Sequence, residues 1–263
     1  MKKQIQKLLV LFLGGLICSG CTVSKHAQVN AGNGLFSVGE NKQVHFSTGN
    51  LQYKPNTDTW RSAECQYHYV GGKNANVDPS YDGWIDLFGW GTGNHPCDTS
   101  QDNANYATFE DWGNNVGEGW RTLTIEEWHY VLFDREDANA KYAIGTIDNV
   151  YHGLILLPDD WTLPEGCEFV PGCNGWEGNL YSVTQWQRME AEGAIFLPAT
   201  GRRIGREVEL LNIGGYGFYW SSTPSQNFDY VYGMHFDRKY VGITEGGESK
   251  YFATSVRLVC DKK

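Results

Sequence analysis

The residue types with most capacity for chemistry are histidine, cysteine and paired carboxylates, and here their spacing matches no known catalytic or metal-binding motif. The acidic pairs Glu126-Glu127 and Asp159-Asp160 are adjacent, so on a strand they point to opposite faces and on a helix they do not meet. The sequence contains no nucleophile elbow, His-Glu-x-x-His helix or phosphate-binding glycine loop. Metal-ligand spacing is also missing among the histidines His45, His68, His95, His129, His152 and His235. We therefore predict a non-enzymatic protein with no catalytic residue, cofactor or bound metal.

The cysteines that follow Cys21 are odd in number, which does not suit a complete disulfide framework; they are Cys65, Cys97, Cys167, Cys173 and Cys260. Cys167 and Cys173 enclose a short loop and are the best candidates for a pair. We expect the others to be buried thiols. A zinc site is the alternative, although the sequence has no Cys-x-x-Cys spacing.

The segment between residues 219–223 and 255–259 has the composition of a presented binding surface. Tyrosine gives contact area at a low entropy cost, and Asn, Asp and Ser give adaptable hydrogen bonds. We predict that residues 224–250 bind a protein or glycan ligand. The candidate residues are Asn227, Asp229, Tyr230, Tyr232, His235, Asp237, Arg238, Lys239 and Tyr240.

Alternation along a strand predicts which of these candidates are accessible. If the apolar residues Met234 and Phe236 face the core, then His235 and Asp237 face the opposite side. Tyr230 and Tyr232 share the inward parity unless a bulge intervenes. Residues 235–239 are therefore the strongest part of the predicted site.

Two capping boxes predict two short helices that hold this segment in place. Thr124 with Glu127, and Ser182 with Gln185, have the spacing at which a cap hydroxyl and the third helical residue satisfy each other's backbone N–H groups. An apolar stripe follows each cap, consisting of Ile125, Trp128 and Leu132 in the first helix and of Val183, Trp186 and Met189 in the second.

Short runs that alternate apolar and polar residues, or are continuously apolar, predict strands. They lie at residues 36–38, 43–47, 51–53, 60–69, 151–158 and 194–199, with a hairpin-rich sheet from residue 219 onward. Residues 71–108 are long, polar and glycine-rich, and loops of this length are usually functional or held by aromatic anchors, here the Trp residues. The pattern predicts an α+β domain with a twisted, mostly antiparallel sheet and long glycine-rich loops.

The first residues predict export. Lys2 and Lys3 precede a short apolar run, and small residues precede Cys21, so residues 1–20 are interpreted as a lipoprotein signal peptide and Cys21 as the lipidated residue. Residues 21–34 then form a tether and residues 35–263 a single domain. An ordinary cleaved signal is the alternative, because Cys18 stands where a lipobox usually has Leu. We predict a lipid-anchored, surface-exposed protein of the cell envelope, attached to the outer membrane.

Composition sets two further limits. A net charge of −10 argues against a nucleic acid partner, because phosphate binding requires a basic surface. Ten Trp residues and 41% hydrophobic residues supply a sizeable core. Within apolar phrases, Arg121 and Arg257 need hydrogen bonds or ion pairs, and Glu127 is the expected partner of one of them.

Several phrases together resemble the sulfatase-modifying-factor branch of the C-type-lectin-like fold. They are Trp120-Arg121-Thr122-Leu123-Thr124-Ile125-Glu126-Glu127-Trp128, Tyr219-Trp220-Ser221-Ser222-Thr223 and Ser255-Val256-Arg257-Leu258-Val259. Two more are similar to the Fibrobacter major paralogous domain family of Bacteroidetes surface lipoproteins: Leu154-Ile155-Leu156-Leu157-Pro158-Asp159-Asp160-Trp161 and Phe196-Leu197-Pro198-Ala199-Thr200-Gly201. The resemblance covers residues 36–260 and implies a C-type-lectin-like fold.

This resemblance leaves several functions open. The formylglycine-generating relatives bind copper with two cysteines near the chain end, and this sequence has only Cys260 there, so an enzyme with altered chemistry is the alternative to recognition. A structural, envelope or fimbria-associated protein is a third reading. The calcium-binding motifs of sugar-binding lectins are missing, and calcium elsewhere would fall among Asp98, Asp102 and Glu110. Residues 224–250 also resemble the variable region of retroelement-diversified proteins, with an ordinary polar hairpin as the alternative.

Overall fold

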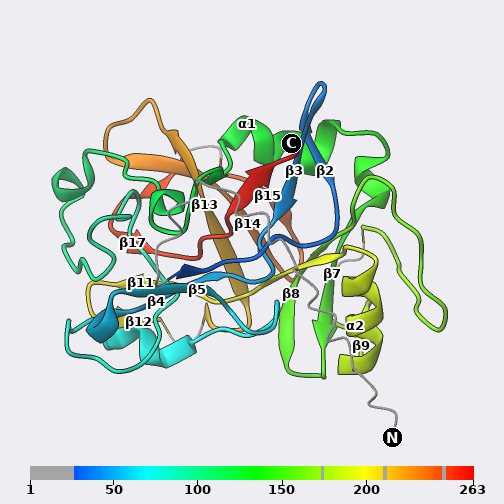
Figure 1. Cartoon of the computed structure of the whole chain (residues 1–263), viewed down its shortest axis with the longest axis horizontal. Coiled ribbons are helices and arrows are strands. Elements are labelled where there is room, and N and C mark those ends of the chain that lie inside the picture. The colour runs from blue at the N-terminus through cyan, green and yellow to red at the C-terminus, as the bar shows by residue number, and fades with distance from the viewer. Residues whose placement is uncertain (1–26, 173–174, 210–211, 245–246) are drawn as a thin grey trace, which may run out of the picture.

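The computed structural model describes residues 27–172, 175–209, 212–244 and 247–263 (Figure 1). The predicted signal peptide at 1–20, Cys21, residues 21–26 of the tether and Cys173 lie outside the described residues, so these assignments stay predictions. None of the helices in the described ranges combines the length and the apolar character of a membrane span.

The described strands form five small sheets in place of the one twisted sheet that the sequence predicts. One sheet joins segments from both ends of the domain, because β3 pairs antiparallel with β18. Its order is β2 (Phe36–Gly39), β3 (Lys42–Phe46), β18 (Val259–Asp261) and β6 (Trp120–Arg121). A second sheet has the order β1 (Ala27–Gln28), β5 (Thr59–Ser62) and β4 (Leu51–Lys54).

Three sheets come from the later part of the chain. The first has the order β10 (Ile195–Pro198), β8 (Tyr151–Leu156), β7 (Tyr142–Ile147) and β9 (Leu180–Tyr181). The next has the order β12 (Glu207–Val208), β11 (Arg203–Ile204) and β17 (Phe252–Ala253). The last contains β13 (Tyr216–Pro224), β14 (Tyr230–Asp237) and β15 (Val241–Ile243), and β16 (Glu248–Ser249) also pairs with β14. Most pairs are antiparallel, which confirms the mixed α+β, mostly β class.

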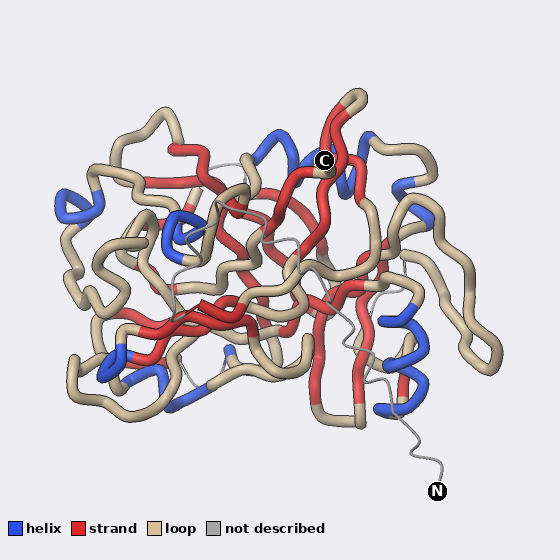
Figure 2. The backbone as a smooth tube through the Cα atoms, viewed as in Figure 1, coloured by secondary structure: helices blue, strands red, loops and turns tan. Residues whose placement is uncertain are grey.

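Both predicted helices form with the predicted caps. They are α1 (Ile125–His129) and α2 (Val183–Ala191), and each capping box is complete in both directions. A π-helix, η5 (Tyr130–Asp134), continues α1, so that Leu132 is buried with Ile125 and Trp128. The 3₁₀ turns are η1 (Pro55–Thr57), η2 (Gly71–Ala75), η3 (Asn103–Tyr106), η4 (Trp112–Asn115) and η6 (Ala138–Ala140). Figure 2 shows strands filling the middle of the molecule, with loops and short helices around them.

Two strand predictions were incomplete. The predicted strand at 60–69 ends at Ser62, the last residue of β5, and residues 63–70 belong to no helix or strand. The strand β7 was not predicted at all, although it pairs along its whole length with β8. Its residues 142–147 mix Gly and Thr with apolar residues, so they show neither alternation nor a continuous apolar run.

The hairpin of β13 and β14 lies between two of the three apolar clusters that the described residues form. Met234 and Phe236 pack into the cluster that contains Trp128. Val231 and Phe218 belong to the cluster that contains Trp90 and Trp112. Both faces of the hairpin are therefore covered along much of its length, and Figure 1 shows it crossing the middle of the molecule.

Glu127 combines the two roles predicted for it. Its carboxylate accepts two hydrogen bonds from Arg121, at 2.6 and 2.9 Å, and one from the Thr124 backbone N–H at 2.9 Å. Lys42 Nζ lies 2.5 Å from the same carboxylate. Burial favours a higher pKa for Glu127, but the hydrogen bonds from Arg121, Lys42 and the Thr124 N–H outweigh it and hold the pKa below its ordinary value.

Glu127→Gln is expected to lower the free energy of unfolding by about 1–2 kcal/mol at pH 7, because the neutral amide keeps the cap but loses the charged hydrogen bonds. A carboxylate with a lowered pKa stabilises the fold above its unfolded-state pKa, and this stabilisation is lost as pH falls through the folded-state value. The deficit should therefore shrink below pH 4.5, the ordinary value. Urea denaturation at pH 7 and at a pH below 4.5 measures this deficit in the free energy of unfolding. Exposed Glu126→Gln is the control, and equal stability of the two variants at pH 7 would contradict the prediction.

Candidate functional site

The predicted site residues fall into two groups at opposite ends of β14. Asn227, Asp229 and Tyr230 lie in or beside the turn between β13 and β14. Asp237, Arg238, Lys239 and Tyr240 lie at the turn between β14 and β15. At about 3.3 Å per residue, the two ends of this eight-residue strand are roughly 23 Å apart. The structure therefore does not bring the predicted residues together into one site.

His235 faces away from Met234 and Phe236, as alternation predicts, but it is only partly exposed. Its ring packs against Tyr216, Phe218 and Tyr240. Burial lowers the pKa of His235, and the neighbouring Asp237 only partly opposes this effect. The interpretation of His235 as an exposed contact residue is therefore corrected to that of a packing residue.

Asp237 and Tyr232 also have structural partners. Asp237 Oδ1 accepts hydrogen bonds from the backbone N–H groups of Lys239 and Tyr240, at 2.7 and 3.0 Å, and so shapes its own turn. Tyr232 is partly buried against the same cluster as Met234. At this end of the hairpin, Arg238, Lys239 and Tyr240 are the exposed candidates.

The turn between β13 and β14, residues 225–229, is the more exposed end of the hairpin. Asn227 Oδ1 accepts from the Asp229 N–H at 3.1 Å, and the Asn227 carbonyl accepts from the Tyr230 N–H at 3.0 Å. These bonds leave two aromatic rings at the surface, with Phe228 58% exposed and Tyr230 36% exposed. Phe228 was not among the predicted site residues, which are polar, charged or tyrosine side chains.

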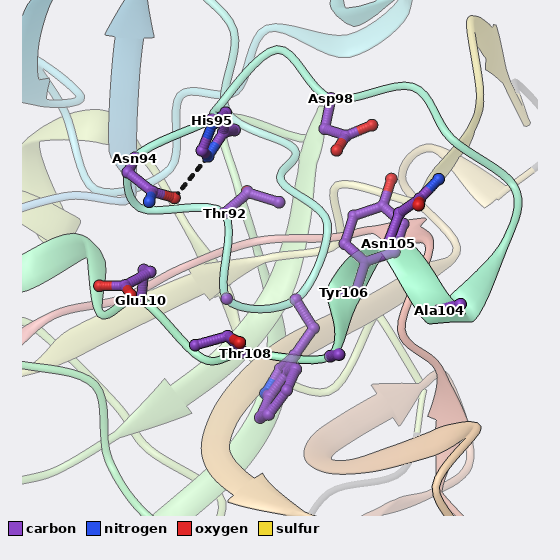
Figure 3. Close-up of a pocket in the computed structure, with 12 residues that line it drawn as sticks. Thr92, Asn94, His95, Asp98, Ala104, Asn105, Tyr106, Thr108 and Glu110 are labelled. Atoms are coloured by element: carbon purple, nitrogen blue, oxygen red, sulfur yellow. Dashed lines mark hydrogen bonds between the residues drawn. The ribbon is translucent and has the colours of Figure 1, made fainter.

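A pocket of about 610 Å³, the loop pocket, opens between residues 90–98 and 104–110. Figure 3 shows its side chains around a central space, with Asn94 and His95 on one side and Asn105 and Tyr106 on the other. The remaining polar side chains of the lining are Thr92, Asp98, Thr108 and Glu110. The sequence singled out this loop for its length and glycine content but did not identify the pocket.

Two buried aromatic residues, Trp90 and Tyr106, anchor the lining of the loop pocket. Trp90 is buried, its Nε1 donates to the Ser221 carbonyl at 2.9 Å, and its ring packs against Phe109. Tyr106 is also buried, and its hydroxyl donates to the Ser100 carbonyl at 2.9 Å. The prediction that a Trp anchors the long loop is confirmed at Trp90.

Several polar groups of the rim have no hydrogen bond to another described residue. Among the described residues, the carboxylate of Glu110 and the Nδ2 group of Asn94 make no side-chain hydrogen bond. His95 Nδ1 lies 2.6 Å from Asn94 Oδ1, which leaves His95 Nε2 for another partner. Acceptors and donors of this kind on an open rim can bind the hydroxyl groups of a ligand.

Lys250 connects the loop pocket to the β13–β14 turn. It is buried, and its Nζ lies 5.3 Å from the centre of the Trp90 ring and 4.1 Å from that of Phe228. The Lys250 carbonyl also accepts from the Trp90 N–H at 2.9 Å. Burial lowers the pKa of Lys250, while Asp229 favours the charged form. Lys250 therefore lies between the Phe228 ring of the turn and the Trp90 ring of the pocket, and the turn together with the pocket is here called the turn–pocket surface.

The described residues contain no group of three His, Cys, Asp or Glu side chains placed to hold a metal ion. Asp98 and Glu110 line the loop pocket, but Asp102 instead caps η3 by accepting from the Ala104 N–H. The described structure therefore does not gather these three acids at one point. Cys65, Cys97 and Cys260 are half-buried, not fully buried as predicted. Cys167 is buried, and its pairing with Cys173 stays a prediction because Cys173 lies outside the described residues.

A family model described as a domain of unknown function, DUF8237, matches residues 183–259. No curated protein and no solved structure matches the chain. The matched residues run from the start of α2, through the β13–β14 hairpin, to the first residue of β18. The match therefore includes the β13–β14 turn and Lys250 but not the residues that line the loop pocket.

Proposed function

We propose that this protein is a non-enzymatic recognition module with a C-type-lectin-like fold, carried by a lipid-anchored bacterial surface protein, and that it binds a glycan at the turn–pocket surface. The lining of the loop pocket carries the proposal. A sugar presents hydroxyl groups that both donate and accept, and amide, imidazole and carboxylate groups surround this pocket.

Size and shape favour a glycan over a flat protein partner. The pocket volume of about 610 Å³ lies within the range of about 300–1,000 Å³ that small-ligand sites occupy. Beside it, the exposed rings of Phe228 and Tyr230 offer apolar area for the C–H face of a sugar ring. Because Lys250 joins the two parts, a ligand longer than one sugar can contact both.

The arrangement of the chain supports the C-type-lectin-like part of the proposal. β3 and β18 come from opposite ends of the domain and pair in one sheet. Residues of the phrases that carry the resemblance are buried in the core: Trp220 Nε1 donates to the Phe88 carbonyl at 2.7 Å, and Arg257 is 1% exposed. In this arrangement the buried phrases hold the loops in place, and the turn–pocket surface contacts the ligand.

Binding to a glycan array, followed by calorimetry with the best oligosaccharide, tests the proposal. The variant Asn94→Ala with Glu110→Gln should bind that oligosaccharide about 10–100-fold more weakly, because it loses an amide and a charged acceptor. Asn139→Ala with Glu136→Gln changes two exposed residues outside the pocket and should bind as the wild type does. Unchanged affinity in the pocket variant, or no binding to any glycan on the array, would refute the proposal.

A further inference from the structure

A second hollow of about 290 Å³ adjoins the loop pocket and has a different lining. The two share His95 and Asp98, so the short segment that contains these residues separates them. The other lining residues of the second hollow are Tyr53, Pro55, Pro79, Pro96 and Cys97. We call it the proline hollow, because three of the chain's eight prolines line it.

The proline hollow offers few hydrogen-bonding groups away from its boundary with the loop pocket. Proline has no backbone N–H, so these three residues present ring carbons to the hollow and no donor. Tyr53 is buried, and its hydroxyl already donates to Asp58 Oδ1 at 3.1 Å, which leaves its ring as an apolar wall. Burial raises the pKa of the Cys97 thiol, so this side chain stays neutral at physiological pH.

The size of the proline hollow suits a substituent of a ligand. Its volume lies just below the range of complete small-ligand sites. At the shared boundary, Asp98 accepts from the Ser100 N–H through Oδ1, and His95 Nε2 has no bond to another described residue. A ligand that lies in the loop pocket and reaches across this segment therefore meets polar partners first and apolar walls afterwards.

We propose that the two hollows form one site for an N-acetylated glycan, in which the sugar ring occupies the loop pocket and the acetamido methyl group enters the proline hollow. The amide of the acetamido group then lies at the boundary beside His95 and Asp98. This inference rests on the proposed glycan binding and narrows it to one class of sugar.

Matched oligosaccharides that differ only in the acetamido group test the inference by calorimetry. Chitotriose and cellotriose share linkage and length, and N-acetylgalactosamine with galactose gives a second pair. We expect the N-acetyl member to bind about tenfold more tightly, because it buries a methyl group and an amide that the hydroxyl member lacks. Cys97→Phe, which fills the hollow, should abolish this difference while the binding of the hydroxyl member is kept.

Chemical modification of Cys97 tests the inference without the Cys97→Phe variant. Modification of the half-buried Cys97 by methyl methanethiosulfonate at pH 8.5 should slow at least fivefold in the presence of the N-acetyl sugar. Cys65 and Cys260, which are also half-buried but do not line either hollow, are the internal controls. Equal affinity for both members of each pair, together with no protection of Cys97, would overturn the inference about N-acetylated glycans but leave the proposed glycan binding intact. Failure of all sugars to bind would overturn both the inference and the proposed function.

Discussion

Arg257→Leu, a change within the Ser255–Val259 phrase, is expected to lower the free energy of unfolding by about 3–5 kcal/mol. Arg257 is only 1% exposed and donates to the carbonyls of Ser47, at 2.9 Å, and Phe196. Leucine fills part of the space but leaves both buried carbonyls without these donors. An unsatisfied buried acceptor costs about 1–3 kcal/mol, and the lost packing of the longer side chain adds to this.

The bond to Phe196 has a particular importance, because β10 is an edge strand. Its free side is satisfied by side chains: Gln66 Oε1 accepts from the Phe196 N–H at 2.8 Å, and Gln66 Nε2 donates to the Ala194 carbonyl at 3.0 Å. Arg257 supplies the donor for the Phe196 carbonyl, and the Tyr219 hydroxyl donates to the Pro198 carbonyl at 3.0 Å. Because Arg257 also binds Ser47, it links β10 to the segment that follows β3.

Urea denaturation followed by fluorescence of the buried Trp residues measures this loss. Arg206→Leu is the matched control, because Arg206 is exposed, and it should change the stability by less than about 0.5 kcal/mol. Arg257→Lys keeps the positive charge and a single ammonium donor. Its loss of stability should therefore lie between those of Arg257→Leu and Arg206→Leu. A loss below 1 kcal/mol for Arg257→Leu would contradict the role assigned to it.

The parts of the fold that the sequence predicted are those set by residues close together in the chain. A capping box needs only four consecutive residues, and both boxes formed as the spacing of Thr124 and Ser182 predicts. The pairing of Arg121 with Glu127 is similarly local, six residues apart. The side-chain alternation of β14 also followed the sequence, since Met234 and Phe236 are buried.

The candidate site was predicted less well, because it depends on contacts between distant segments. Alternation gives the face of His235 but not the neighbours on that face, and Tyr216 lies there with its hydroxyl 3.4 Å from His235 Nδ1. The separation of Asn227 from Lys239 follows from the length of the strand between them. The loop pocket comes from a segment without periodicity, so the sequence indicated only that this loop needed an anchor.

Asn74→Asp is expected to lower the free energy of unfolding by about 3–5 kcal/mol at pH 7, although the two side chains have the same shape. Asn74 is fully buried, and its Nδ2 donates to Asp86 Oδ1 at 2.7 Å and to the Gly71 carbonyl at 3.0 Å. Aspartate removes both donors and places a second carboxylate against that of Asp86. Two adjacent buried carboxylates cannot both ionise without a large cost.

The stability of Asn74→Asp, measured as a function of pH, distinguishes the effect of the carboxylate pair from that of lost packing. In the wild type, burial raises the pKa of Asp86 to about 6, while hydrogen bonds from Asn74 and the Val70 N–H limit the rise. For an acid whose pKa is raised by folding, the folded state binds the proton more tightly, so stability increases as pH falls through the folded-state value. In Asn74→Asp the shared proton has a still higher pKa, so its deficit relative to the wild type should shrink between pH 7 and pH 5.

Asn76→Asp is the control for this experiment, because Asn76 is exposed and bonds only to the Lys73 carbonyl through Nδ2 at 3.1 Å. Its stability should lie within about 1 kcal/mol of the wild type at both pH values. A deficit in Asn74→Asp that stays constant from pH 7 to pH 5 would show that lost packing, and not the carboxylate pair, destabilises the variant. Because Asp86 also accepts from the Val70 N–H at 2.8 Å, a pH-dependent deficit would show that this buried carboxylate anchors the start of the long loop that leads to the loop pocket.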